Sequence, residues 1–320
     1  MSNYKELSLA ECADRLLSVE RPLVVMHIRP DGDTVGSGAA LCEIFRALGK
    51  EPRYTCPDPI PERLAFLVEG FTRSDEYEKY DAVAIDVPSP MQLGELSERL
   101  RVSFMIDHHR ISTPFAPHYT VSTASSAGEV LLGLARELQA RGELCITKKM
   151  AELIYAAISS DTGGFAYSNA TEKTYRDAAD LISLGIDHAD INRRLFDSKS
   201  EKEILAEGII GARLETGANG KIAYATLTKE ERESLGLSFS DFETSIDIVR
   251  ALRGSEIAFV IKETDSGEYK ASLRSVGANV AEVAARHSGG GHIRAAGCTV
   301  SAGSMKEARD ILIKELELLV

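Results

Sequence analysis

Short apolar runs alternate with longer amphipathic segments over roughly the first 190 residues of this 320-residue chain. The apolar runs have the length and near-continuous apolar character of buried parallel strands. They lie at residues 23–26, 81–86 and 103–107, and a further strand is expected at 53–55. The amphipathic segments predict helices at about 126–140, 148–159 and 171–184. A further helix is predicted with Thr34 as its cap, running through Val35 to Phe45 and ending at Gly49. Strands and helices in alternation predict an α/β fold with a parallel sheet.

The pattern changes after residue 190. Residues 191–212 are charged and helical in period, whereas three strand-like runs follow at 221–226, 257–261 and 270–274. Residues 265–268, Asp-Ser-Gly-Glu, predict a hairpin turn between the last two runs. We therefore expect a parallel-sheet domain over 1–190, a helical connector at 191–212 and a smaller α/β domain over 213–320. Two domains joined in this way imply a cleft between them.

Composition narrows the choice of function. The net charge of −12 argues against a protein that grips long nucleic acid by neutralising many phosphates, but it leaves room for a small nucleotide substrate. No apolar stretch approaches the roughly 20 residues of a membrane helix, and the first residues do not resemble a signal peptide. The five cysteines are scattered and form no CxxC pair. We expect reduced thiols and a cytoplasmic protein that does not bind membranes.

Acidic and imidazole side chains follow three of the predicted strands. His27, Asp31 and Asp33 come after the first run, Asp86 after 81–85, and Asp107-His108-His109 after 103–106. Because ligands gather at the carboxyl ends of parallel strands, these segments are expected to converge. The candidate metal ligands of this domain are His27, Asp31, Asp33, Asp86, His108 and Asp161.

The ligand types indicate the metal. Carboxylates and imidazoles without thiolate suit Mn²⁺, with Mg²⁺, Co²⁺ or Fe²⁺ as competitors. Six ligands are too many for one such ion, so we expect two ions per chain that share a bridging carboxylate. A lone aspartate after a strand is more often a cap or turn residue, but the adjacent imidazoles at 108 and 109 favour the metal site.

With these motifs, the chain resembles the DHH/DHHA1 phosphoesterase family, which is named for the triplet at 107–109. The carboxy-terminal signature of the family is matched by Ser272-Leu273-Arg274-Ser275 and by the segment 289–297, which begins Gly-Gly-Gly-His. The resemblance implies one Mn²⁺ bound by His27, Asp31 and Asp86. It implies a second bound by Asp33, Asp86, His108 and Asp161, with Asp86 as the bridge.

The second domain offers the expected substrate residues. Three glycines in a row allow a backbone to approach an anion closely, and nearby Arg and His side chains would complete a phosphate and nucleotide pocket. The predicted binding residues are Arg274, Ser275, Gly289, Gly290, Gly291 and His292. His109 is expected to face the substrate as a hydrogen-bond donor or acid, and Asp107 to orient an imidazole from behind the ligands.

The family resemblance implies hydrolysis of short oligoribonucleotides, pApA included, to nucleoside monophosphates, and of 3′-phosphoadenosine 5′-phosphate to AMP. A phosphodiesterase for cyclic or linear di-AMP is the alternative. A RecJ-like single-strand exonuclease and a non-catalytic nucleotide sensor rank lower. The sequence leaves open the preferred substrate, the direction of cleavage and the oligomeric state, a homodimer included.

Overall fold

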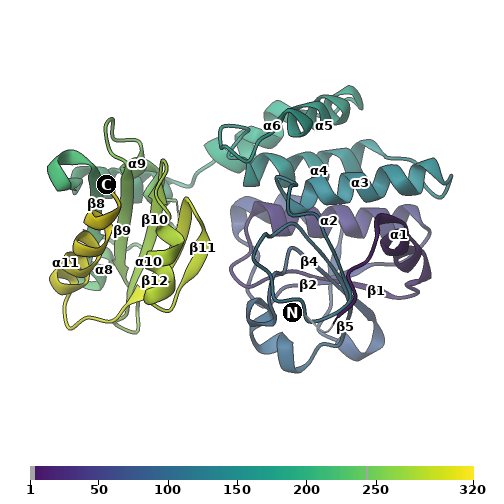
Figure 1. Cartoon of the computed structure of the whole chain (residues 1–320), viewed down its shortest axis with the longest axis horizontal. Coiled ribbons are helices and arrows are strands. Elements are labelled where there is room, and N and C mark those ends of the chain that lie inside the picture. Colours follow the sequence, from purple (N-terminus) through teal and green to yellow (C-terminus); the bar gives the residue numbers. More distant parts are fainter. Residues whose placement is uncertain (1–3, 243) are drawn as a thin grey trace. The chain divides into compact units, whose positions relative to one another are not determined.

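A computed structural model of the chain describes residues 4–242 and 244–320, apart from the side chain of His292. The chain divides into two compact units, Met1–Ser198 and Lys199–Val320, which are drawn in Figure 1. The division falls inside the segment 191–212 that the sequence predicts as a connector. Each unit has its own sheet and its own hydrophobic core.

The first unit contains a six-stranded sheet in which every strand is parallel to its neighbours, in the order β3-β2-β1-β4-β5-β6. The strands are β1 Pro22–Val25, β2 Arg53–Thr55, β3 Thr72–Arg73, β4 Asp81–Ile85, β5 Val102–Asp107 and β6 His118–Thr120. The predicted parallel sheet is confirmed, and β3 and β6 are short edge strands that the pattern did not indicate. The chain runs outward from β1 to β3 and returns to the other side of β1 with β4. Such a switch point is where open sheets bind ligands.

Helices cover one face of this sheet. They are α1 Leu9–Ser18, α2 Gly32–Ala47, α3 Ala127–Ala140, α4 Lys148–Asp161, α5 Glu172–Ser183 and α6 His188–Asn192. Figure 1 shows α2, α3 and α4 side by side above the strands. Val24, Val83 and Phe104 point into the core that these helices share, whereas Leu23 and Met105 point to the opposite face. That face packs against the 3₁₀ segment Pro90–Glu98. Burial on both faces explains why the strands read as continuous apolar runs.

The beginning of α2 differs from the prediction. Asp31, not Thr34, is the N-cap, and its Oδ1 accepts hydrogen bonds from the backbone N–H groups of Asp33 and Thr34, each at 3.0 Å. The helix therefore begins at Gly32, two residues before the predicted cap, because an aspartate at this position satisfies two otherwise unpaired N–H groups. Gly49 follows the helix with a φ of +76°, as expected of a glycine that ends a helix.

The second unit contains a six-stranded mixed sheet in the order β11-β12-β10-β9-β8-β7. Its strands are β7 Glu215–Gly217, β8 Ile222–Leu227, β9 Ile257–Glu263, β10 Tyr269–Ser275, β11 Gly290–His292 and β12 Ala295–Val300. Only β8 and β9 pair in parallel, and the other neighbours are antiparallel. The predicted turn at 265–268 joins β9 to β10, with the N–H of Thr264 donating to the carbonyl of Glu268 at 2.8 Å.

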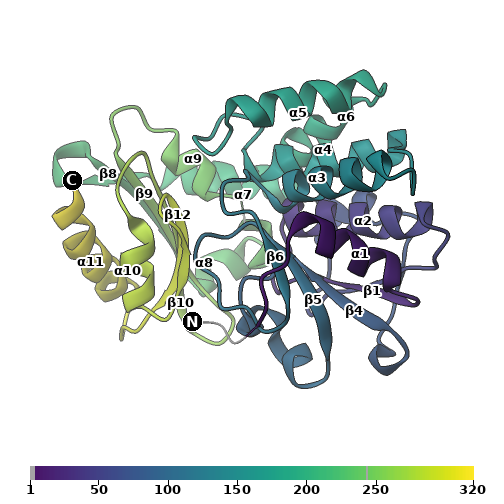
Figure 2. The ribbon, with the colours of Figure 1, turned by 45° about the vertical axis from the view of Figure 1, so that its right-hand side comes forward.

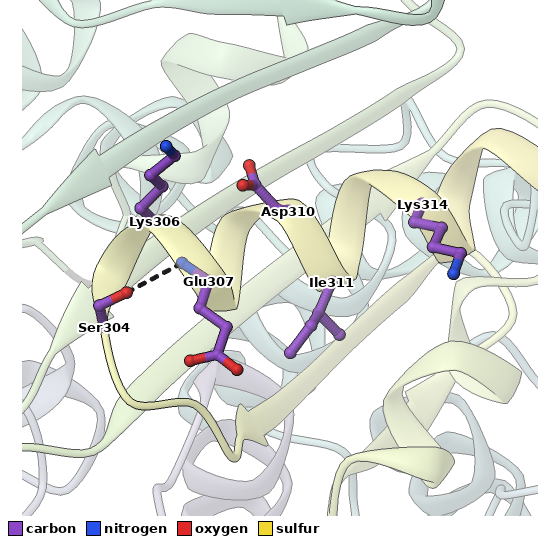
Figure 3. A pocket seen from close by; sticks show the side chains of 6 residues that line it. All are labelled: Ser304, Lys306, Glu307, Asp310, Ile311 and Lys314. Atoms are coloured by element: carbon purple, nitrogen blue, oxygen red, sulfur yellow. Dashed lines mark hydrogen bonds between the residues drawn. The ribbon is translucent and has the colours of Figure 1, made fainter.

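Helices lie on both faces of the second sheet. They are α7 Glu201–Ala212, α8 Lys229–Ser234, α9 Ile246–Arg250, α10 Val280–Arg286 and α11 Met305–Leu316. Helices α10 and α11 share one core with the sheet, and α7 and α9 share another on the opposite face (Figure 2). Ser304 caps α11 by accepting from the N–H of Glu307 at 3.2 Å (Figure 3). Among the residues that the structure describes, none belongs to a helix long and apolar enough to span a bilayer.

Candidate metal centre

The end of β1 and the start of α2 supply the first group of polar side chains. Nδ1 of His27 donates to the carbonyl of Ile28 at 2.7 Å, so the proton of a neutral ring is on Nδ1 and the lone pair on Nε2. Nε2 lies 3.8 Å from Oδ1 of Asp31 and 3.6 Å from Oδ2 of Asp86. The Asp31 side chain is exposed, and it also caps α2. His27, Asp31 and Asp86 thus form one cluster.

Asp86 occupies an unusual position directly after β4. Its φ is +60°, a left-handed conformation that is uncommon outside glycine and that persists only where the surrounding structure fixes it. Its N–H donates to the carbonyl of Ile106 at 2.9 Å, which holds the residue against the end of β5. The carboxylate is buried, and its two oxygens face different imidazoles: Oδ2 faces His27, and Oδ1 lies 3.4 Å from Nε2 of His108.

The second cluster forms around His108. Its Nε2 lies 3.6 Å from Oδ2 of Asp33 and 4.0 Å from Oδ2 of Asp161, the last residue of α4. The Asp33 carboxylate is bound by the first two N–H groups of α3: Ala127 donates to Oδ2 at 2.7 Å and Gly128 to Oδ1 at 3.1 Å. A helix N-terminus is a favourable site for an anion, so these N–H groups favour the carboxylate form of Asp33 against the effect of its burial.

Asp107 contacts His109 and not a predicted ligand ring. Its Oδ1 accepts from Nδ1 of His109 at 2.7 Å and from the backbone N–H groups of His108 and His109, at 2.8 and 3.3 Å. His109 is partly exposed, and its Nδ1 lies 3.6 Å from Oδ1 of Asp86. The sequence left open which imidazole Asp107 orients, and in the structure that ring is His109.

The six predicted ligands therefore lie in two clusters. His27, Asp31 and Asp86 have donor atoms within 4.8 Å of one another, and so do Asp33, His108 and Asp161. Asp86, His108 and His109 form a third, overlapping cluster on the same criterion. Asp86 links the first two clusters, since its two oxygens face one imidazole in each.

The predicted substrate residues lie together in the second unit. Arg274 and Ser275 end β10, and Arg274 pairs with Ala295 at the start of β12. The hydroxyl of Ser275 donates to the carbonyl of Ala278 at 2.5 Å, and its N–H donates to the carbonyl of Arg294 at 3.0 Å. The two parts of the signature are thus adjacent in the sheet. The hollow in Figure 3, lined by Ser304, Lys306, Glu307, Asp310, Ile311 and Lys314, contains none of these residues.

The glycine run has a structural reason that the sequence did not reveal. A Cβ on Gly289 would lie 2.1 Å from the carbonyl oxygen of Gly297, and a Cβ on Gly291 would lie 2.5 Å from that of Ala295. Both glycines are therefore required by the close pairing of β11 with β12. Around Gly290, in contrast, no described atom lies within 4 Å of such a Cβ. The side chain of His292 lies outside the described residues.

Comparison with known proteins identifies the family. Residues 21–158 match the DHH family, N-terminal domain, and residues 219–318 match the DHHA1 domain. The chain belongs to the DHH/DHHA1 family.

Relatives of similar length share this organisation. The chain is 28% identical to the "Bifunctional oligoribonuclease and PAP phosphatase NrnA" of Thermus thermophilus, over 94% of this chain and 91% of that one. It is 29% identical to the protein of the same name from Bacillus subtilis, over 92% of each. The crystal structure of an exopolyphosphatase-related protein from Bacteroides fragilis superposes with a TM-score of 0.87 at 25% identity, covering 97% of this chain and 96% of that one.

The electrostatics of this DHH domain fit a divalent cation. Burial raises the pKa of Asp33 well above its ordinary value, and the charge of Asp86 adds to the rise. Burial likewise raises the pKa of Asp161 to about 7. Burial opposes protonation of His27, but the nearby carboxylates of Asp86 and Asp31 outweigh it and raise its pKa to about 9. Protons thus offset the crowded negative charge in the metal-free protein, and a bound cation would replace them.

The Asp86 carboxylate also fits a divalent cation. Burial alone would raise its pKa, but the imidazoles of His108 and His27 outweigh burial and lower it below the ordinary range. Its buried Oδ1 has no hydrogen-bond partner within the described part of the chain. A buried carboxylate oxygen without a hydrogen bond is costly, and coordination to a metal removes that cost. Oxygen and imidazole donors in this arrangement suit Mn²⁺ and its competitors.

Two contributors to the centre were not predicted from the sequence. The N–H groups at the start of α3 that bind Asp33 belong to a predicted helix, but no pattern indicated which carboxylate they would receive. Asn169, whose side chain donates to Asp161, lies in a loop without periodicity. The one feature of the sequence that could have indicated the Asp33 contact was Ser126, the α3 N-cap, because the start of a capped helix is a general site for an anion.

Proposed function

We propose that this DHH/DHHA1 protein is a metal-dependent phosphoesterase that hydrolyses short oligoribonucleotides to nucleoside monophosphates and 3′-phosphoadenosine 5′-phosphate to AMP. The observation that carries the proposal is Asp86, whose two buried oxygens each face the imidazole of a different ligand cluster. One carboxylate shared between two metal positions is the arrangement used to hydrolyse phosphoesters. The names of the Thermus and Bacillus relatives supply the substrate class.

The proposed centre holds two Mn²⁺ ions. His27, Asp31 and Asp86 would hold one, and Asp33, Asp86, His108 and Asp161 the other. When bound, these ions supply Lewis acidity, which activates water and neutralises charge on the phosphoryl oxygens. Asp31 would combine two roles, because its Oδ1 caps α2 while the carboxylate faces His27.

His109 would act on the substrate. With Nδ1 donating to Asp107 at 2.7 Å, the ring is held in one orientation, and protonation leaves an N–H on Nε2. Burial opposes protonation of His109, but Asp107 and Asp86 outweigh it and raise its pKa above the ordinary value. A charged N–H donor can stabilise the developing charge on a phosphoryl oxygen or protonate the leaving oxygen. Asp107 would be the positioning residue for this ring.

The substrate residues belong to the domain that we place at 213–320, after the connector at 191–212 and the metal-binding domain at 1–190. Arg274 would pair with a phosphate through its guanidinium, next to Ser275 at the end of β10. Gly290 has open space around it, so its backbone would be the part of the glycine run that approaches an anion, together with Gly289, Gly291 and His292. The guanidinium charge of Arg274 would select substrates with a terminal phosphate.

The test is hydrolysis of pApA and 3′-phosphoadenosine 5′-phosphate by the full chain in Mn²⁺, with products separated by chromatography. We expect AMP from both compounds, with inorganic phosphate released from the second. Arg274→Ala should raise KM and leave the Mn²⁺ content unchanged. If both nucleotides bind but neither is turned over in Mn²⁺, Mg²⁺ or Co²⁺, the protein is a sensor and the proposal is wrong. Turnover of cyclic di-AMP alone would favour the di-AMP alternative.

A further inference from the structure

One short segment contacts the second ligand cluster, which consists of Asp33, His108 and Asp161. Residues 124–128 run from the end of the loop after β6 into the first turn of α3, and their sequence is Ala-Ser-Ser-Ala-Gly. The last two N–H groups of the segment donate to Asp33, and its first carbonyl lies 3.5 Å from Nδ1 of His108. A proton on Nδ1 directed at that carbonyl leaves the Nε2 lone pair for the cluster. The segment thus orients two of the three members directly.

Asn169 connects the same segment to the third member. Its Nδ2 donates to the carbonyl of Ser125 at 3.0 Å, to the carbonyl of Asp161 at 3.0 Å, and lies 3.4 Å from Oδ2 of Asp161. One side-chain amide therefore contacts both the backbone of the segment and the carboxylate of a predicted ligand. Residues 124–128 are thus linked to Asp33 and His108 directly and to Asp161 through Asn169.

A buried carboxylate fixes the segment in place. Glu129, in the first turn of α3, accepts from the N–H and the hydroxyl of Ser125 at 3.1 and 2.6 Å. It also accepts from the hydroxyl of Thr174 at 3.0 Å and from Nζ of Lys173 at 2.7 Å. Four donors, two from the loop and two from α5, hold this α3 side chain, so the carbonyl that Asn169 contacts is tied to both helices.

Asp161 needs this support more than Asp33 does. Asp33 lies at the N-terminus of α3, where backbone N–H groups attract an anion, whereas Asp161 is the last residue of α4. The partial negative charge at a helix C-terminus disfavours a carboxylate there. Asn169 compensates by donating to the Asp161 carbonyl, one of those that the helix end leaves without an intrahelical partner, and by approaching the carboxylate itself.

We propose that Asn169 is a positioning residue of the metal centre: it ties the Asp161 carboxylate to residues 124–128 and so keeps it aligned with Asp33 and His108. This inference rests on the two-metal centre of the proposed function and adds a residue outside the ligand set. Residues that orient metal ligands commonly contribute about 10- to 100-fold to metal affinity. Loss of Asn169 should therefore lower the affinity for one of the two ions and leave the affinity for the other unchanged.

The test measures Mn²⁺ binding by equilibrium dialysis with metal analysis, on wild type and Asn169→Ala. We expect two tight ions on wild type, and on the variant one tight ion and one weakened about 10- to 100-fold. The Mn²⁺ concentration for half-maximal activity should rise by a similar factor, with kcat recovering at saturating Mn²⁺. Asn169→Leu, which keeps the volume and removes the donor, should behave alike and serves if the alanine variant does not fold.

Asn192 provides a matched control. It is also a partly buried asparagine against α4: its Oδ1 accepts from Ser159 at 2.6 Å, and its Nδ2 donates to Tyr155 at 3.2 Å. Asn192→Ala should lower thermal stability and retain both ions. If wild type binds two ions and both Asn169 variants retain both affinities, the positioning role is wrong while the metal centre stands. If wild type binds no divalent ion, the centre falls and this inference with it.

Discussion

Nδ1 of His109 lies 2.7 Å from Oδ1 of Asp107, whose side chain is fully buried. The same oxygen accepts the N–H groups of His108 and His109, so one carboxylate fixes both the backbone of the triplet and the ring of its last residue. Asp107→Asn keeps an acceptor oxygen but removes the charge that favours protonation of His109. We expect kcat to fall about 10- to 100-fold with Mn²⁺ content unchanged.

A double-mutant cycle checks that Asp107 acts through His109. If it does, Asp107→Asn should cost little more once His109 has been replaced by alanine, because the two residues work as one unit. Additive losses in kcat, or loss of Mn²⁺ from the single Asp107 variant, would show that Asp107 supports the metal ligands instead.

Features of the fold and the metal centre could be predicted from the sequence where the residues that determine them are close together along the chain. Apolar runs such as 23–26 predicted strands because these strands are buried on both faces of the sheet. Polar residues after parallel strands were expected to converge because the carboxyl ends of such strands lie at one edge of the sheet. The α2 cap was wrongly predicted at Thr34, because Asp31 was considered only as a metal ligand and not as a helix cap. The contact between Asn169 and Ser125 joins residues 44 apart through a loop, and no local pattern encodes such a contact.

Asp86→Asn tests the bridging carboxylate. Asparagine, like aspartate, tolerates the left-handed backbone at φ +60°, so this variant changes the ligand without straining the turn, as alanine would. We expect hydrolysis to fall at least about a hundredfold and the Mn²⁺ stoichiometry to drop below two. A loss smaller than about tenfold in kcat, with both ions retained, would contradict a bridge at this position.

Alanine variants at Gly289 and Gly290 distinguish a structural role of the glycine run from a role in substrate binding. Gly289→Ala places a Cβ 2.1 Å from the carbonyl of Gly297, so the β11–β12 hairpin must open and the melting temperature should fall. Gly290→Ala meets open space, so the fold should survive. If the run also receives a phosphate, Gly290→Ala should raise KM for pApA at unchanged stability. An unchanged KM would limit the run to its structural role.

The stability of the first unit should depend on pH through Glu129. Burial alone would raise its pKa, but hydrogen bonds from Lys173 and Ser125 outweigh it and lower the pKa below the ordinary value. The ionised form therefore stabilises the fold, fully above the unfolded pKa and progressively less as pH falls through the lowered folded pKa. Glu129→Gln should reduce the melting temperature most near neutral pH, and its gap from wild type should narrow on acidification. A gap that widens in acid would contradict this sign.

We expect the rate of hydrolysis to depend strongly on substrate length, because an acidic protein offers few positive charges to the phosphates of a long strand. A protein of net charge −12 lacks the many phosphate contacts that long single strands need, so binding energy must come from the terminal nucleotide near residues such as Arg274 and from the metal centre. We expect dinucleotides to pentanucleotides to be hydrolysed far faster than strands of about 20 nucleotides, with a shallow dependence on salt since few counterions are released. The measurement is kcat/KM for a length series at two ionic strengths. If the long strand is hydrolysed as fast as the short ones, with steep inhibition by salt, the protein would be a RecJ-like exonuclease instead.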